Sequence, residues 1–182
     1  MGIDLFHAEM IVREHLFRPL PETVHLLGRQ TVLFGEETAR SLLSRYGIFP
    51  AASKVVLDTA TVGAKAAADR GYITDETFFG MLGVKEIKAI DHSDYEAADV
   101  IVDLNQPLPE ALEGNADFIF GGSVLDNIFD PATYIKNIGQ LLKPGGRLID
   151  QNICSFHHHP YILASPAWYF DYFVGSSGNS EG

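Results

Sequence analysis

Two short apolar runs that each end on an aspartate are the feature that most constrains how this chain can fold. In "IKAIDHSDYEAADVIVDLN", residues 87–105, the first run leads into Asp91 and the second leads into Asp103. Short runs of this kind, with aliphatic residues at successive positions, are typical of strands that are buried on both faces. A carboxylate after each run indicates that both strands end at a polar edge.

The order of the elements predicts a parallel sheet. Strands are expected at residues 23–27, 87–90, 99–102, 117–120 and 147–151. Helices are expected between several of them, notably after Thr74 and after Asp130, because both residues suit the N-cap position. Strands that alternate with helices form a mostly parallel sheet with helices on both faces. The expected fold class is therefore α/β and Rossmann-like.

Length and composition fit one domain. The chain has 182 residues, of which 46% are hydrophobic and 20% charged, as is usual for a soluble globular protein. We expect residues 1–174 to form this domain, with an N-terminal helix within residues 1–20. Residues 31–73 would be a long excursion after the first strand of the sheet. The small polar residues 175–182 predict a disordered tail.

Charge and cysteine content narrow the location and the partners. Thirteen basic and 24 acidic residues give a net charge of −11, which disfavours binding to nucleic acid or to an anionic membrane. A single cysteine, Cys154, excludes an internal disulfide and fits a reducing compartment. The sequence shows neither a membrane-spanning stretch nor a secretion signal. We expect a cytoplasmic protein.

The two aspartates suit a nucleoside site. Ligands of open α/β sheets bind at the carboxyl ends of the strands. A carboxylate that ends the second strand can accept both hydroxyls of a ribose, and a polar group that ends the third can meet the amino group of adenine. Asp91 and Asp103 have this placement. Either one alone equally suits a turn, which aspartate favours, but together they favour the nucleoside.

From residue 74 onward the chain resembles the class I S-adenosylmethionine-dependent methyltransferases. It resembles particularly a bacterial group that is often associated with modification of saccharides or small metabolites. The matching segments are "TFFGMLGVKEIKAIDHSDYEAADVIVDLNQPLP", "ADFIFGGSVLDNIFDPATYIKNIGQLLKPGGRLI" and, more loosely, "FHHHPYILASPAWYFDYF". This resemblance implies S-adenosylmethionine as the cofactor. The residues that it places at the cofactor are Asp91 and Ser93 near the ribose, Asp103 and Leu104 beside the adenine, and Gly121 and Gly122 near the methionine portion.

The glycine-rich turn that such enzymes carry after the first strand is missing, since the sequence holds no GxGxG. One substitute is "HLLGRQ", which is favoured because the resembling group has Gly-Arg-Gln at this place. The other is "VVLDTATVG", in which a strand and an acidic residue precede alanine and valine. In the first case Gly28 forms the turn. Arg29 then either pairs with the carboxylate of the cofactor or is an ordinary surface arginine.

The catalytic group is the least defined part of the sequence. After the fourth strand the resembling proteins carry an acid and then a Glu-His pair, whereas this chain has Asp126 and Asn127, and asparagine is no general base. His159 in "SFHHHPY" falls where the group often has a histidine, so it is the candidate for orienting or deprotonating an acceptor hydroxyl. His157 and His159 can face one ion, but no paired ligands accompany them, and we expect no metal.

The combined interpretation is an S-adenosylmethionine-dependent methyltransferase that acts on a small-molecule or saccharide acceptor. One alternative is a non-catalytic, methyltransferase-like binding module, which the missing glycine turn and Asn127 favour. Another is a nicotinamide-dependent oxidoreductase, which needs a GxGxxG turn that the sequence lacks. No sixth or seventh strand is evident. Either the sequence is part of a longer chain, or a second copy covers the open sheet edge in a homodimer.

Overall fold

The sheet has the strand order of a Rossmann-like fold. The computed structural model describes residues 2–50, 54–152, 162–163 and 165–175. Five strands form the main sheet in the order β5-β4-β2-β6-β7, and all of their pairings are parallel. Counted along the chain, this order is third, second, first, fourth, fifth, which places a topological switch point between β2 and β6. The predicted α/β class is confirmed.

The strands lie close to the predicted positions. Their bounds are Thr23–Leu27 for β2, Glu86–Asp91 for β4, Val100–Ile101 for β5, Ala116–Gly122 for β6 and Leu142–Gln151 for β7. The last strand begins earlier than predicted, because the "KPGG" segment continues directly into it with a register irregularity against β6. The sequence leaves Val55–Asp58, in "VVLDTATVG", open between a strand and an interior loop, and the structure forms no strand there. Leu57 forms only an isolated antiparallel bridge with Ile73, outside the sheet.

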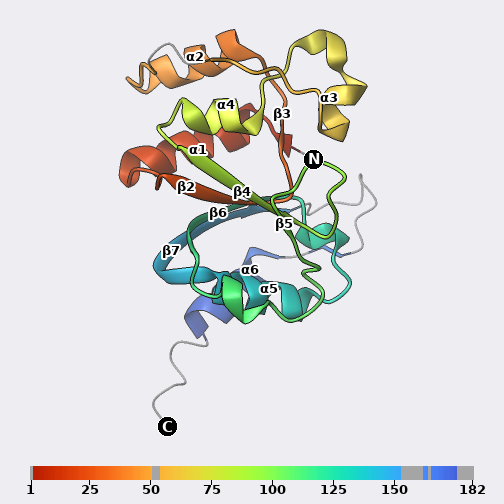
Figure 1. The fold of residues 1–182 in the computed structure, drawn as a ribbon. Helices are drawn as coiled ribbons and strands as arrows, with labels where there is room; N and C mark the ends of the chain where they lie inside the picture. The colour runs from red at the N-terminus through yellow and green to blue at the C-terminus, as the bar shows by residue number, and fades with distance from the viewer. Residues whose placement is uncertain (1, 51–53, 153–161, 164, 176–182) are drawn as a thin grey trace.

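Helices cover both faces of the sheet (Figure 1). One face carries α1, α2 and α4, and the other carries α5 and α6. Their bounds are Leu5–Phe17 for α1, Glu36–Arg45 for α2, Asp75–Gly80 for α4, Pro131–Leu141 for α5 and Pro166–Phe170 for α6. The predicted N-caps are confirmed, since Thr74 accepts a hydrogen bond from the backbone of Thr77 and Asp130 accepts one from Thr133.

Alternation along β2 divides the core between the two faces. Val24 and Leu26 pack with α1, α2 and α4, whereas Leu27 packs with α5 on the opposite face. Successive side chains of a strand point to opposite sides, so one apolar strand supplies both cores. The aromatic stretch after Ser165 packs against the second core through Trp168 and Tyr169.

The segment between β2 and α4 adds a small layer beside the sheet. Strand β3 (Thr31–Val32) pairs in parallel with β1 (Gly2–Ile3) at the start of the chain. Helix α2 and the short α3 (Val62–Ala66) follow before the chain returns to α4. This layer lies at the carboxyl end of β2, so the first turn of the sheet is covered by residues from the same excursion (Figure 1).

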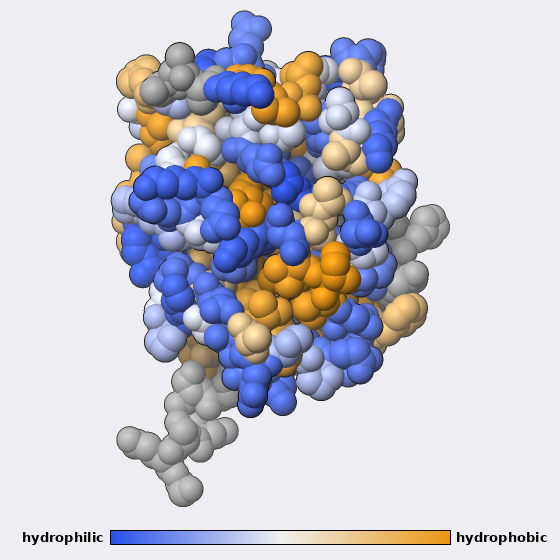
Figure 2. Space-filling view, viewed as in Figure 1, coloured by the Kyte–Doolittle hydropathy of each residue, from blue (hydrophilic) through white to orange (hydrophobic). Residues whose placement is uncertain are grey.

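The remaining short elements are 3-10 turns and one π-helical turn. They are η1 (Ala68–Arg70), η2 (Glu110–Leu112), η3 (Leu125–Asn127) and the π-helical η5 (Asp171–Gly175). Figure 2 shows a mainly hydrophilic surface on the viewed face, with a large group of hydrophobic residues below its centre and smaller groups elsewhere. Within the described residues, no helix combines the length and the apolar character that crossing a bilayer requires.

Asn137 holds the segment that follows β5. It is buried in α5, where its side-chain nitrogen donates to the carbonyls of Leu104 at 3.1 Å and Gln106 at 2.7 Å. Its side-chain oxygen accepts from the backbone N–H of Leu108 at 3.0 Å. The path of the chain just after Asp103 therefore depends on one buried amide.

Replacing Asn137 with alanine removes these three contacts and leaves buried backbone groups without partners. We expect the free energy of unfolding to fall by about 3 kcal/mol, measured by urea denaturation. Asn115→Ala is the control, because the Asn115 side chain is exposed and makes one bond to the Ala111 carbonyl. Equal losses in the two variants would contradict this assignment.

Candidate functional site

Gly28 forms the turn at the end of the central strand β2. Its φ of +69° is in the left-handed region, and its N–H donates to the Ile90 carbonyl on β4 at 2.7 Å. A Cβ at this position would lie 3.3 Å from Oδ2 of Asp91. Glycine is therefore needed both for the backbone conformation and for the close approach to Asp91. Of the two predicted substitutes for the glycine-rich turn, "HLLGRQ" follows the first strand of the sheet.

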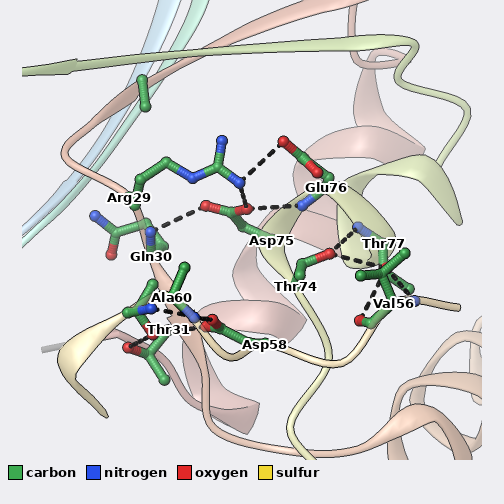
Figure 3. A network of polar contacts seen from close by, with 12 residues as sticks. Arg29, Gln30, Thr31, Val56, Asp58, Ala60, Thr74, Asp75, Glu76 and Thr77 are labelled. Carbon is green, nitrogen blue, oxygen red and sulfur yellow. Dashed lines mark hydrogen bonds and ion pairs between the residues drawn. The ribbon is translucent and has the colours of Figure 1, made fainter. Parts of the chain in front are cut away.

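A buried carboxylate on α4 anchors the rest of this turn (Figure 3). Asp75 is 1% exposed, and its Oδ2 accepts the backbone N–H of Gln30 at 3.0 Å. Its Oδ1 lies 2.5 Å from Nη2 of Arg29 and accepts the backbone N–H of Glu76 at 2.8 Å. The same Nη2 lies 3.0 Å from Oε1 of Glu76. The Arg29 side chain is thus mostly buried and ion-paired, which excludes the interpretation of it as an ordinary surface arginine.

The ion pair between Arg29 and Asp75 offsets the cost of burying the two charged groups. Burial raises the pKa of Asp75, while Arg29 and the N–H groups of Gln30 and Glu76 oppose that rise. Burial lowers the pKa of Arg29, but Asp75 and Glu76 outweigh it and the net shift is upward. Figure 3 shows the second terminal nitrogen of Arg29 pointing away from both carboxylates. Arg29 therefore keeps donors that can meet another group.

Gln30 connects the turn to the neighbouring strands. Its buried side-chain nitrogen donates to the carbonyls of Leu27 at 2.9 Å and Gly28 at 3.2 Å. Its side-chain oxygen occupies the space that a Cβ on Gly122 would need. The side chain therefore closes the turn internally and packs on the tip of β6.

Asp91 is the last residue of β4 and faces the turn. Its Oδ1 accepts the backbone N–H of His92 at 2.6 Å and lies 2.7 Å from Nδ1 of the same histidine. Its Oδ2 is the atom nearest to Gly28, and within the described part of the chain it has no hydrogen-bond donor. The side chain is 26% exposed, so this oxygen is at the protein surface.

A pocket of about 430 Å³ lies beside Asp91. Three of the predicted cofactor residues, Arg29, Asp91 and Ser93, line it. The other lining residues come from β1, β3, α3 and the loop after β4, and they are Gly2, Thr31, Leu33, Val62, Gly63, His92, Tyr95 and Glu96. Val62 and Gly63 belong to "VVLDTATVG". The two segments that competed as the glycine turn therefore meet at one pocket.

Side-chain contacts hold α3 against the loop after β4. Oε1 of Glu96 accepts the backbone N–H of Val62 at 2.6 Å, and the Lys65 ammonium lies 5.2 Å from the centre of the Tyr95 ring. Three of these four residues, Val62, Tyr95 and Glu96, line the pocket, so the contacts hold one of its walls together.

A hydrogen-bonded chain fixes the inner side of α3 (Figure 3). The Thr31 hydroxyl donates to the Thr61 hydroxyl at 2.7 Å, which donates to Oδ2 of Asp58 at 2.6 Å. Asp58 also accepts the backbone N–H groups of Ala60 and Thr61. The excursion is thereby tied to β3, directly after the turn at 28–30.

Asp103 and Leu104 follow the neighbouring strand but do not line this pocket. The backbone N–H of Val102 donates to the Asp91 carbonyl at 2.7 Å, so both aspartates lie at the same edge of the sheet. Oδ1 of Asp103 accepts the backbone and side-chain N–H groups of Asn105, which lower the pKa of this exposed carboxyl. Leu104 is buried in the second core.

Gly121 and Gly122 end β6, next to the switch point. A Cβ on Gly121 would meet Oδ1 of Asp150, and one on Gly122 would meet the side-chain oxygen of Gln30. Because these two glycines have no side chains, the side chains of Asp150 and Gln30 can occupy the space beside them. A role of the two glycines beside the methionine portion stays a prediction.

A polar cluster at the tip of β7 was missed by sequence reasoning. Oδ2 of Asp150 accepts the hydroxyls of Tyr169 at 2.6 Å and Tyr134 at 2.9 Å, and Asn152 donates to Tyr169 at 2.8 Å. Burial raises the pKa of Asp150, and the two tyrosine hydroxyls oppose the shift. The cluster connects α5 and α6 to the sheet. Its one sequence signal is an aspartate at the end of a predicted strand.

Of the residues considered for catalysis or metal binding, Asn127 is described and the histidines of "SFHHHPY" are not. His157 and His159 lie outside the described residues, so the predicted catalytic role of His159 is untested. The Asn127 amide donates to the Ser123 carbonyl at 3.1 Å, so it stabilises the turn after β6. Within the residues that are described, no group of three or more His, Cys, Asp or Glu side chains is arranged to hold a metal ion.

Asp75 and Gln30 are the other residues that sequence reasoning missed. An acid in the first turn of a helix is already explained by the helix dipole, so Asp75 gave no separate signal. Gln30 is part of the predicted turn "HLLGRQ", but a polar residue after a strand is normally predicted to be exposed. Their importance depends on burial, which neither local pattern indicates.

Comparison with known proteins gives distant structural likenesses. A SAM-dependent methyltransferase from Aquifex aeolicus is 16% identical, with 94% of this chain and 78% of that chain covered and a TM-score of 0.44. The trans-methyltransferase CalH, solved in complex with SAH, is 17% identical, with 92% and 38% covered and a TM-score of 0.38. No protein-family model matches the chain, and no curated protein matches it.

Gly28→Ala should lower the free energy of unfolding by about 1–2 kcal/mol, because a Cβ strains the left-handed conformation. Gly47→Ala is a matched control, since Gly47 has φ +72° but no atom within 4 Å of its would-be Cβ. In urea denaturation both variants should lose stability, and Gly28→Ala at least as much as Gly47→Ala. An unchanged Gly28→Ala protein would show that the turn is not held in this conformation.

Asp150 should make stability depend on pH. Its pKa is raised in the folded state, so ionisation opposes folding above that pKa, and the penalty disappears as the pH falls below the unfolded value. We therefore expect the parent protein to gain stability relative to Asp150→Asn as the pH is lowered from 7 toward 4. Urea denaturation at several pH values measures this difference, and a constant difference would contradict the burial argument.

Proposed function

We propose that the pocket beside Asp91 binds S-adenosylmethionine and that the protein transfers a methyl group to a small-molecule or saccharide acceptor. The observation that carries the proposal is the Asp91 carboxylate at the tip of the second strand of a 3-2-1-4-5 sheet. Its Oδ2 lies beside the glycine turn, and Asp91 lines a pocket of about 430 Å³. Pockets of this size accommodate ligands of cofactor dimensions.

The residues around Asp91 fit a nucleoside. Two adjacent ribose hydroxyls are donors, and a carboxylate offers two acceptor oxygens to match them. His92 already donates to Oδ1 of Asp91, which orients the carboxylate and leaves Oδ2 beside Gly28 without a donor from the described residues. The close approach at Gly28 leaves no side chain between the turn and Oδ2. This supports a ribose contact by Asp91, with Ser93 beside it.

The other cofactor contacts are part of the same proposal. Arg29 lines the pocket, and its second terminal nitrogen, which pairs with no carboxylate among the described residues, is suited to the carboxylate of the methionine portion. Asp103, beside His92, would meet the adenine together with Leu104. Gly121 and Gly122 would lie near the methionine portion, beyond the 28–30 turn.

For methyl transfer, the main task of the protein is to align the acceptor with the methyl group. When bound, S-adenosylmethionine supplies a methyl group on an already activated sulfonium, so the protein has to place a nucleophile in line with it. His159 is proposed to orient or deprotonate an acceptor hydroxyl. Saccharide hydroxyls and other small acceptors both suit that role.

A binding-only relative is the second candidate. The Asn127 amide is engaged with the Ser123 carbonyl and has no basic nitrogen, so it cannot replace a catalytic histidine. A protein that binds the cofactor but turns over no acceptor fits this arrangement.

The sheet edge suggests a homodimer. Strand β7 spans ten residues, and its outer edge pairs with no described strand. Such an edge presents unpaired N–H and carbonyl groups that another strand can meet. We propose that a second copy covers it, and light scattering coupled to size exclusion tests this. A strictly monomeric protein would contradict the proposal.

Calorimetric titration with S-adenosylhomocysteine tests the cofactor proposal. We expect binding by the parent protein and at least about a tenfold loss for Asp91→Ala, because a charged acceptor of two hydroxyls is removed. Asp117→Ala is the control, since Asp117 pairs with Lys143 at the other end of the sheet. Absence of any binding by the parent would end the proposal.

A further inference from the structure

The turn that approaches the proposed nucleoside is held by side chains instead of a run of glycines. Gly28 is the only glycine between Leu27 and Thr31. The turn is closed by Gln30, which donates to two carbonyls of the turn itself, and its backbone N–H at Gln30 donates to Asp75. In a glycine-rich turn the backbone can adopt the required conformation because glycines lack side chains. Here the Asp75 carboxylate on α4 holds the turn in its conformation instead.

The anchor of this turn is itself rigid. Asp75 is the first residue of α4, directly after the N-cap Thr74, and the next turn of the helix buries Phe78 and Phe79 in the first core. Its own carboxylate is almost fully buried and has a donor on each oxygen, from Gln30 on one and from Arg29 and Glu76 on the other. Movement of this carboxylate would require movement of the helix.

The tips of the two strands beside β2 depend on the position that Asp75 imposes. The N–H of Gly28 is bonded to Ile90 on β4, which brings the turn within 3.3 Å of Oδ2 of Asp91, measured from the would-be Cβ. The Gln30 side chain packs on Gly122 at the tip of β6. A shift of the turn would thus change the approach to Asp91 and the packing on β6 together.

We propose that Asp75 is a positioning residue of the nucleoside pocket. It does not line the pocket, and it acts by holding Gly28 in register with Asp91 and by holding Arg29 at the pocket wall. This inference rests on the proposed function, because it assigns a role within the same site. It predicts that the affinity for the nucleoside part of the ligand depends on the Asp75 side chain, although this side chain does not contact the ligand.

Glu76 provides an internal control for the charge of Arg29. It contacts the same Nη2 of Arg29 at 3.0 Å, but its side chain is 60% exposed and accepts no backbone N–H of the turn. An exposed ion pair contributes little, whereas a buried carboxylate that satisfies backbone donors contributes much more. If charge on Arg29 alone mattered, Glu76→Gln and Asp75→Asn would behave alike.

The test compares two ligands by calorimetry, S-adenosylhomocysteine and 5′-methylthioadenosine, which has the nucleoside but lacks the amino-acid portion. We expect Asp75→Ala to weaken both by at least about tenfold. Asp75→Asn should recover part of the affinity for 5′-methylthioadenosine, because an amide oxygen can still accept from Gln30. Glu76→Gln should bind both ligands within about twofold of the parent.

A second control separates positioning from loss of stability. Glu14→Ala removes the ion-pair partner of Arg147, which pairs with Phe118 near the start of β6, and should lower the melting temperature without changing either affinity. All titrations are run at a temperature where each variant is folded by circular dichroism. Parent-like affinities in folded Asp75→Ala, or equal losses in Glu14→Ala, overturn the inference while the proposed function stands. A parent that binds neither ligand overturns both.

Discussion

The hydrogen bond from the Gln30 backbone to the buried carboxylate of Asp75 is the contact on which the geometry of the site depends. It joins the turn after the central strand to the first turn of α4. Because Asp75 also pairs with Arg29, one carboxylate satisfies a backbone donor and compensates a mostly buried guanidinium. A buried acid is costly unless both of its oxygens are occupied, and here both are. The contacts that offset the cost of burying Asp75 are the same ones that hold the turn in place.

The pocket beside Asp91 is assembled from distant parts of the chain. The start of the chain contributes β1, the excursion contributes β3 and α3, and the loop after β4 contributes Tyr95 and Glu96. In an open parallel sheet the carboxyl ends of the strands meet at one edge, and connections that leave this edge can fold over it. The long segment between β2 and α4 therefore has a clear structural use, which is to wall the pocket.

Sequence reasoning located most of the sheet because its strands are short apolar runs separated by capped helices. It also identified the edge that carries Asp91, since an aspartate after a buried run is a local signal. It did not decide between a strand and an interior loop at Val55–Leu57, where an apolar run forms only a single bridge. Asp75 and the Asp150 cluster escaped it as well, because their roles depend on contacts between residues 45 and 16 positions apart.

The sequence by itself determined the α/β class, the parallel strands and the polar character of their ends, because apolar periodicity and capping residues act locally. Only the tertiary structure decided which of two weak turns follows the first strand and that both segments reach the same pocket. It also decided that Arg29 is paired with a buried acid. Those outcomes depend on which side chains are removed from water together, and burial is a property of the packed chain that no short stretch of sequence contains.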